Sequence, residues 1–256
     1  MLDLVSTDIW VMLSLAALLA GFIDAIAGGG GLLTIPALLF TGMPPHLALG
    51  TNKLAATFGS CTASITFYRK RLFFPQRWRW AMVCTAIGAM LGTIAAYNIS
   101  SQALEKALPA IVLCTAIYTL ITKLKDESNG NEFAAEASPL KQGLQGVGLG
   151  FYDGIAGPGT GAFWTLSTLK LHKLNLLFSS GVARTMNFIS NAVSLVTFVI
   201  LGQVNWLVGL SMGLCIMTGA YLGAHSAIRF GANLIRPVFI LGVSAMAIKL
   251  CWDAWL

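Results

Sequence analysis

The sequence predicts an all-α protein: a polytopic transmembrane bundle built from two copies of one helical unit. Three observations lead to this prediction. The chain is 56% hydrophobic and only 10% charged, whereas a soluble domain has about 25% charged residues. Apolar runs close to the length that crosses ~30 Å of hydrocarbon recur along the whole chain. The third observation is an ordered series of matches between the two halves.

These matches define the repeat. The stretch Gly21–Gly31 reads GFIDAIAGGGG, and Gly150–Thr160 reads GFYDGIAGPGT. Internal duplication of this kind is typical of transporter folds. We therefore expect a first transmembrane repeat over residues 1–122, a polar linker loop over 123–142 and a second transmembrane repeat over 143–256.

Apolar runs and Gly or Pro breaks predict five segments in each half. In the first half they cover residues 9–27, 32–43, 47–67, 80–98 and 103–122. In the second half they cover residues 143–156, 160–171, 177–200, 204–224 and 233–251. The runs 32–43 and 160–171 are short for a full crossing, so they could be short spans, re-entrant pieces or halves of broken helices. We expect eight full spans and two short helices that cross or re-enter.

The basic residues favour halves that run in opposite directions. If the short helices do not cross, the halves are parallel, and five basic residues then face out when the Arg69–Arg79 loop is inside: Lys106, Lys170, Lys173, Arg229 and Arg236. If they do cross, each half has five passes and the N-terminus lies outside. Of the loop charges only Lys106 is then clearly outside. Because cytoplasmic loops are enriched in Lys and Arg, we favour inverted repeats.

Four charged residues within the apolar segments stand out, because a charge at the middle of the bilayer costs at least ~2.5–3.5 kcal/mol to insert. They form two pairs under the repeat: Asp24 with Asp153, and Lys53 with Arg184. One cation from each half near a shared axis would make an anion site. Alternatively, each aspartate pairs with a nearby cation and holds the halves together. The aspartates could also be carboxylates that couple transport to protons.

Glycine-rich breaks precede both short helices and include Gly29, Gly30, Gly159 and Thr160. Backbone N–H groups at such a break, followed by a helix N-terminus, form anion-binding concavities. The other interpretation is close helix packing through small residues, which we favour for Gly88-x-x-x-Gly92 and Gly219-x-x-x-Gly223.

Uncharged polar residues accompany the two cations. Thr51 and Asn52 precede Lys53, and Asn187 follows Arg184 on the same helical face. Such residues could line a pathway for a substrate, or they could form hydrogen bonds between helices.

Other classes of function find little support. The five cysteines lie in apolar runs without metal-ligand spacing, and an HExxH motif is absent from the sequence. The basic residues cluster in short loops, whereas nucleic-acid binding needs a basic stripe on a folded surface. We therefore expect no metal, no cofactor, no nucleic-acid partner and no enzymatic activity.

The paired motifs carry a family resemblance. They read GFIDAIAGGGGLLTIPAL and ALGTNKL in the first half, and GFYDGIAGPGTGAF and NFISN in the second. The chain resembles the TauE/SafE family of sulfite exporters, and within it the YfcA-like bacterial membrane proteins. The resemblance implies transport of sulfite, sulfonates or other organic anions across the inner membrane. This chain departs from the family pattern with Arg184 in place of Lys, and with Val182 and Ala183 in place of small or hydroxyl residues.

The leading expectation is a secondary transporter that exports a small anion by alternating access at the repeat interface. Because an ATP-binding motif is absent from the sequence, an ion gradient or the membrane potential would drive it. An anion channel and a non-transporting subunit of a membrane complex are the alternatives. The expected partners are the anion and the lipid bilayer, with a homo-oligomer left open.

Overall fold

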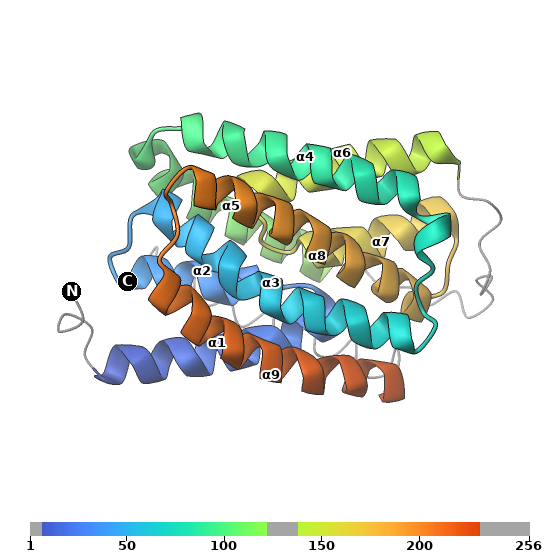
Figure 1. Cartoon of the computed structure of the whole chain (residues 1–256), viewed down its shortest axis with the longest axis horizontal. Coiled ribbons are helices and arrows are strands. Elements are labelled where there is room, and N and C mark those ends of the chain that lie inside the picture. Colours follow the sequence, from blue (N-terminus) through green and yellow to red (C-terminus); the bar gives the residue numbers. More distant parts are fainter. Residues whose placement is uncertain (1–6, 122–137, 231–256) are drawn as a thin grey trace.

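A computed structural model describes residues 7–121 and 138–230, which form nine α-helices and a short 3₁₀ turn (Figure 1). The helices are α1 (Thr7–Ala27), α2 (Gly31–Phe40), α3 (Pro45–Arg69), α4 (Arg79–Asn98), α5 (Ser101–Ile121), α6 (Pro139–Ile155), α7 (Thr160–His172), α8 (Leu176–Ile200) and α9 (Trp206–Phe230). The predicted all-helical class is confirmed. The predicted segment 233–251 and most of the linker 123–142 lie outside the described residues.

The described helices match a membrane environment. Four of them, α1, α4, α8 and α9, are long and apolar enough to cross a bilayer. Their outer faces carry large apolar side chains that are about half exposed, such as Leu19 (53%), Ile87 (46%) and Leu214 (57%). A soluble protein rarely exposes such a continuous apolar surface, whereas lipid tails solvate it. The chain is therefore a multi-pass membrane protein.

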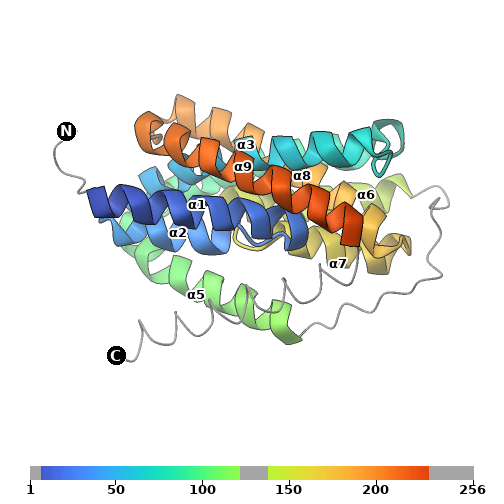
Figure 2. The ribbon, with the colours of Figure 1, turned by 90° about the horizontal axis from the view of Figure 1, so that it is seen from below.

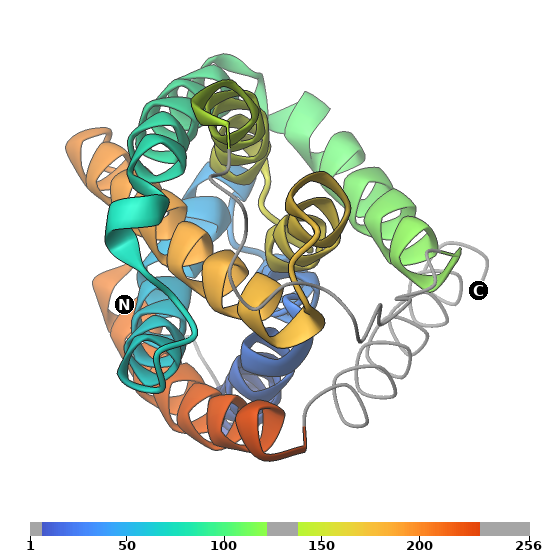
Figure 3. The same ribbon diagram turned by 90° about the vertical axis from the view of Figure 1, so that its right-hand side faces the viewer.

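The two halves pack against each other reciprocally. Helix α1 packs on α9, and its counterpart in the second half, α6, packs on α4. Between these pairs, α3 packs on α8 and α9, while α8 packs on α3 and α4. Figure 3, which looks along the long axis, shows the helices of both halves interleaved around a common centre. Each half therefore completes the packing of the other.

Corresponding helices run in opposite directions along the long axis. In Figures 1 and 2, α1, α3 and α9 run from left to right, whereas α6, α8 and α4 run from right to left. The short helices reverse direction after each break: α2 returns toward the end at which α1 begins, and α7 toward the end at which α6 begins (Figure 1). At about 1.5 Å per residue, α2 is only about 15 Å long and α7 about 20 Å.

Glycines permit the closest helix contacts. The two predicted small-residue pairs lie where α4 crosses α6 and where α9 crosses α1: Gly88 with Gly92, and Gly219 with Gly223. A Cβ atom on Gly92 would overlap the backbone oxygen of Phe151, and one on Gly219 would overlap that of Leu18. The interpretation of these pairs as packing sites is confirmed.

The close packing of α4 on α6 predicts that a Gly→Ala substitution has different effects at two positions. We expect Gly92→Ala to lower the thermal unfolding temperature in detergent, because overpacking costs about 1–3 kcal/mol. The matched control is Gly148→Ala on α6, where a Cβ would meet open space. There alanine should be neutral or stabilising, since it favours helix by about 1 kcal/mol over glycine. Equal shifts for both variants would contradict the packing at the α4–α6 crossing.

Candidate functional site

The two helix breaks touch each other at the centre of the bundle. Gly28 in the first break and Gly157 in the second both have φ of +86°, a conformation that favours glycine. The backbone N–H of Ala162 donates to the carbonyl oxygen of Gly28 at 3.2 Å. A Cβ atom on Gly28 would overlap the Cα atom of Gly161. Position 28 therefore requires glycine for two reasons: its positive φ and this close contact between the halves.

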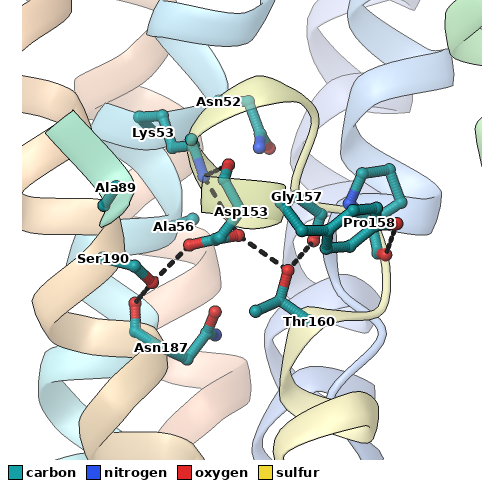
Figure 4. Close-up of polar contacts among 12 residues, drawn as sticks. Asn52, Lys53, Ala56, Ala89, Asp153, Gly157, Pro158, Thr160, Asn187 and Ser190 are labelled. Carbon is teal, nitrogen blue, oxygen red and sulfur yellow. Dashed lines mark hydrogen bonds and ion pairs between the residues drawn. The ribbon is translucent and has the colours of Figure 1, made fainter. Parts of the chain in front are cut away.

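Each buried cation binds the interrupted helix of the other half. The Nζ atom of Lys53, on α3, donates to the carbonyl oxygen of Asp153 at 2.6 Å and forms an ion pair with its Oδ1 at 3.1 Å (Figure 4). Arg184, on α8, donates from Nη1 to the carbonyl oxygen of Asp24. Asp24 and Asp153 lie in the last turns of α1 and α6, and the C-terminal end of a helix favours cations. The carbonyl oxygen of Asp24 also accepts the backbone N–H of Gly28 at 2.9 Å. The two cations therefore cap the two interrupted helices.

The carboxylate of Asp153 is enclosed by donors. Besides the ammonium of Lys53, the hydroxyl of Thr160 donates to its Oδ1 at 2.9 Å. The hydroxyl of Ser190 donates to its Oδ2 (Figure 4). Asp153 is 1% exposed. Both of its oxygens are thus occupied within the fold, and its charge is balanced by the lysine.

The carboxylate of Asp24 has fewer partners. The backbone N–H of Gly30 donates to its Oδ1 at 3.0 Å, and the side-chain amide of Asn187 donates to its Oδ2 at 3.4 Å. In the described part of the chain no lysine or arginine forms an ion pair with it, because Arg184 contacts its backbone oxygen instead. Asp24 is partly exposed and lines a pocket.

This pocket lies between the breaks, with about 430 Å³ of empty space, part of it open to the outside. Its polar lining comes from α1, α2, α3, α6, α7 and α8: Asp24, Thr34, Asn52, Lys53, Asp153, Thr160, Asn187 and Asn191. The first turns of α2 and α7 both face the pocket, through Gly31 and Thr34 and through Thr160 and Gly161. Helix N-termini carry partial positive charge and are suited to bind anions.

Most of the predicted site residues meet at this pocket. It is lined by Gly30, Asn52, Lys53, Gly159, Thr160 and Asn187, together with Asp24 and Asp153. Three others lie elsewhere. Gly29 is not among the lining residues, and the hydroxyl of Thr51 accepts the backbone N–H of Asn205 at the start of α9, at 2.9 Å. Arg184 is 0% exposed and lies behind the break, where Nη2 is 3.5 Å from the Gly161 carbonyl oxygen and from Thr165 Oγ1.

Two contributors to the site did not follow from the sequence. Thr34 lines the pocket and donates to the side-chain oxygen of Asn52. The sequence could have indicated Thr34, because it is the single polar side chain of α2. The contact of Ser190 with Asp153 could not be predicted from the sequence, because it depends on how α8 crosses α6.

Comparison with known proteins agrees with this architecture. The family model described as "Sulfite exporter TauE/SafE" matches residues 13–250. A protein of Haemophilus influenzae named "Probable membrane transporter protein" is 40% identical over 97% of both chains. The "Probable membrane transporter protein YfcA" of Escherichia coli is 36% identical over 99% of this chain and 93% of its own. No solved structure gives a significant match. The chain therefore belongs to the sulfite exporter TauE/SafE family of membrane transporters.

Proposed function

We propose that this protein is an inner-membrane secondary transporter that exports a small anion, such as sulfite, a sulfonate or another organic anion. The observation that carries the proposal is the placement of Lys53: it lines a pocket toward which the first turns of α2 and α7 also face. An oxyanion in this pocket would meet Lys53, which also pairs with Asp153, and two helix N-termini. The family description, a sulfite exporter, supports the substrate class and the direction.

The remaining lining suits a small oxyanion. Asn52 and Asn187 bring side-chain amide donors to the pocket from two different helices, α3 and α8. Amide donors around a central cation can fix the orientation of a sulfonate or sulfite group. Apolar lining is limited to Ala20, Ala56 and Ile216, so a long apolar substituent would find few contacts there.

We propose alternating access as the mechanism. The pocket is bounded by breaks from both halves, so a movement of one half relative to the other would change which side it opens to. A site built at the interface of two repeats is typical of secondary transporters. A channel would share the same residues, and the experiment must therefore separate the two.

We also propose that the two repeats are inverted in the membrane. The opposite directions of α1 and α6, of α3 and α8, and of α4 and α9 support this topology (Figures 1 and 2). The charges support it too. The end of the bundle where α3, α7 and α9 finish, and where α4 and α6 start, carries Arg69, Lys70, Arg71, Arg77, Arg79, Lys141, Lys170, Lys173 and Arg229. By the positive-inside rule this end is cytoplasmic.

The topology predicts opposite labelling of two exposed positions. In a cysteine-free background, we expect Asp8→Cys at the start of α1 to react with a membrane-impermeant maleimide added to intact cells. We expect Lys141→Cys at the start of α6 to react only after the membrane is permeabilised. Labelling of both positions from the same side would exclude inverted repeats.

The transport function predicts counterflow in proteoliposomes. Vesicles loaded with unlabelled sulfite or methanesulfonate should accumulate the labelled anion transiently, because a carrier exchanges bound substrate across the membrane. Protein-free vesicles are the control. Labelled anion that only equilibrates, without transient accumulation, would indicate a channel. The absence of flux across a panel of sulfite, sulfonates, thiosulfate and carboxylates would favour a non-transporting subunit.

The position of Lys53 predicts a loss of transport on its replacement. We expect Lys53→Met to lower counterflow about ten-fold or more, since a hydrogen bond to a charged group contributes about 1.5–3 kcal/mol. Lys106→Met, an exposed lysine on α5, is the matched control and should leave flux unchanged.

A second variant separates binding from folding. Lys53→Met alone leaves the buried Asp153 without its cation, which is expected to destabilise the protein by about 3–5 kcal/mol. The double replacement Lys53→Met with Asp153→Asn removes both charges and should recover much of that stability while transport stays low. A stable double variant that transports at the normal rate would remove Lys53 from the substrate site.

A further inference from the structure

The two aspartates of the repeat have unequal surroundings, and the difference is encoded in the sequence. The hydroxyls that bind the Asp153 carboxylate belong to Thr160 and Ser190. At the corresponding positions of the first half, offset by 129 and 131 residues, stand Gly31 and Gly59. Glycine has no side chain to offer, so the Asp24 carboxylate lacks both donors. Both aspartates line the pocket, but Asp153 is buried with both of its carboxylate oxygens bonded to side chains, whereas Asp24 is partly exposed.

The described cations near Asp24 form no ion pair with its carboxylate, although the charge of Arg184 offsets part of it. From α8, Arg184 donates to its backbone oxygen. From α3, Lys53 is engaged by both the carbonyl and the carboxylate of Asp153 on α6. The lining that α2, α7 and α9 bring to the pocket contains no titratable side chain: Gly31, Thr34, Thr160, Gly161 and Ile216.

An ionised Asp24 makes the pocket poorly suited to an anion. The lining includes two carboxylates, Asp24 and Asp153, and one ammonium group, Lys53, and the guanidinium of Arg184 behind the break brings the sum of these buried charges to zero. The carboxylate of Asp24 is the one that is not in an ion pair with Lys53. Like charges within a few Å repel strongly where water is excluded. An ionised carboxylate also accepts hydrogen bonds only, whereas a protonated one has an O–H to donate. Protonation of Asp24 would remove the repulsion and add a donor for the anion.

We propose that Asp24 is a proton-binding site that is occupied together with the anion, so that one proton crosses the membrane with each anion. This rests on the proposed function and names its coupling ion. Protonated Asp24 keeps its bond from the Gly30 N–H, while Oδ2, which lies beside Asn187, carries the proton. The Lys53–Asp153 pair stays ionised, and the anion binds between Lys53 and the helix N-termini. The proton leaves Asp24 after the anion departs.

Coupling of this kind changes the driving force. A monovalent anion and a proton cross as a neutral pair, so the potential, worth about 2.3 kcal/mol per charge per 100 mV, no longer acts on them. The direction then follows the anion and pH gradients. Export against an acidic exterior requires the anion to be concentrated inside by about ten-fold per unit of pH difference.

The test measures anion binding against pH. Methanesulfonate, which does not titrate in the range used, is added to purified full-length protein, and its apparent affinity is read from thermal stabilisation. In the wild type we expect the affinity to rise as the pH falls, approaching about ten-fold per pH unit, because proton and anion binding are linked reciprocally. Asp24→Asn, and Asp24→Ser as a second neutral variant, should bind with an affinity that does not change with pH.

The matched control is Asp8→Asn, which removes an exposed carboxylate from the same helix and should keep the wild-type pH dependence. Wild-type pH dependence in both Asp24 variants would overturn the proposal, as would binding by the wild type that depends on sodium rather than on pH.

Infrared spectroscopy gives a readout that needs no anion. A pH titration of the wild type should show the C=O stretch of a protonated, buried carboxylic acid, and Asp24→Asn should lose that band while Asp8→Asn keeps it. A band that survives in Asp24→Asn would overturn the assignment. If the band depends on Asp24 but no sulfonate binds at any pH, the proposed function fails and the proton site stands.

Discussion

Each buried cation of this fold is held by the repeat to which it does not belong. Lys53 binds the C-terminal end of α6, and Arg184 binds that of α1. An unpaired ion buried away from water costs several kcal/mol, so neither cation is stable inside its own half alone. The bonds therefore tie the two halves together at the ends of α1 and α6. The pocket, the first turns of α2 and α7 and the contact between the breaks all lie at this junction.

The breaks add a steric constraint to this electrostatic one. The carbonyl oxygen of Gly28 accepts the N–H of Ala162, so the two breaks are in direct backbone contact. A side chain on Gly28 would overlap the backbone of the other break. Helices α2 and α7 must then start beside the same point, which concentrates their N-terminal dipoles there. A duplicated unit thus produces one central site from two glycine-rich breaks.

The sequence was sufficient to predict the helices, the two breaks and the four charged residues, because these depend on local composition and on the repeat. It could not predict that Lys53 lines the pocket while Arg184 lies behind the break. Both positions are equivalent in the repeat, and only the packing of α8 against α7 and the length of the arginine decide where its guanidinium group lies. Thr51 lies outside the pocket lining for a related reason: it is two residues before Lys53 in sequence but faces the start of α9, since successive residues on a helix point about 100° apart.

The symmetry of the backbone and the asymmetry of the side chains have separate consequences. The backbone sets the reciprocal bonds, so the two aspartates occupy matched positions at the ends of α1 and α6. A few side chains then decide their chemistry: Thr160 and Ser190 satisfy Asp153, while Gly31 and Gly59 leave Asp24 without equivalent donors. Among the residues that the structure describes, Asn187, whose counterpart is Ala56, is the side chain that donates to the Asp24 carboxylate, at 3.4 Å. A closed carboxylate can serve as a fixed partner for Lys53, and an open one remains available to change its charge. Two aspartates with identical surroundings could not divide these two roles between them. The positions at which the halves differ are therefore the ones that determine the function of this pocket.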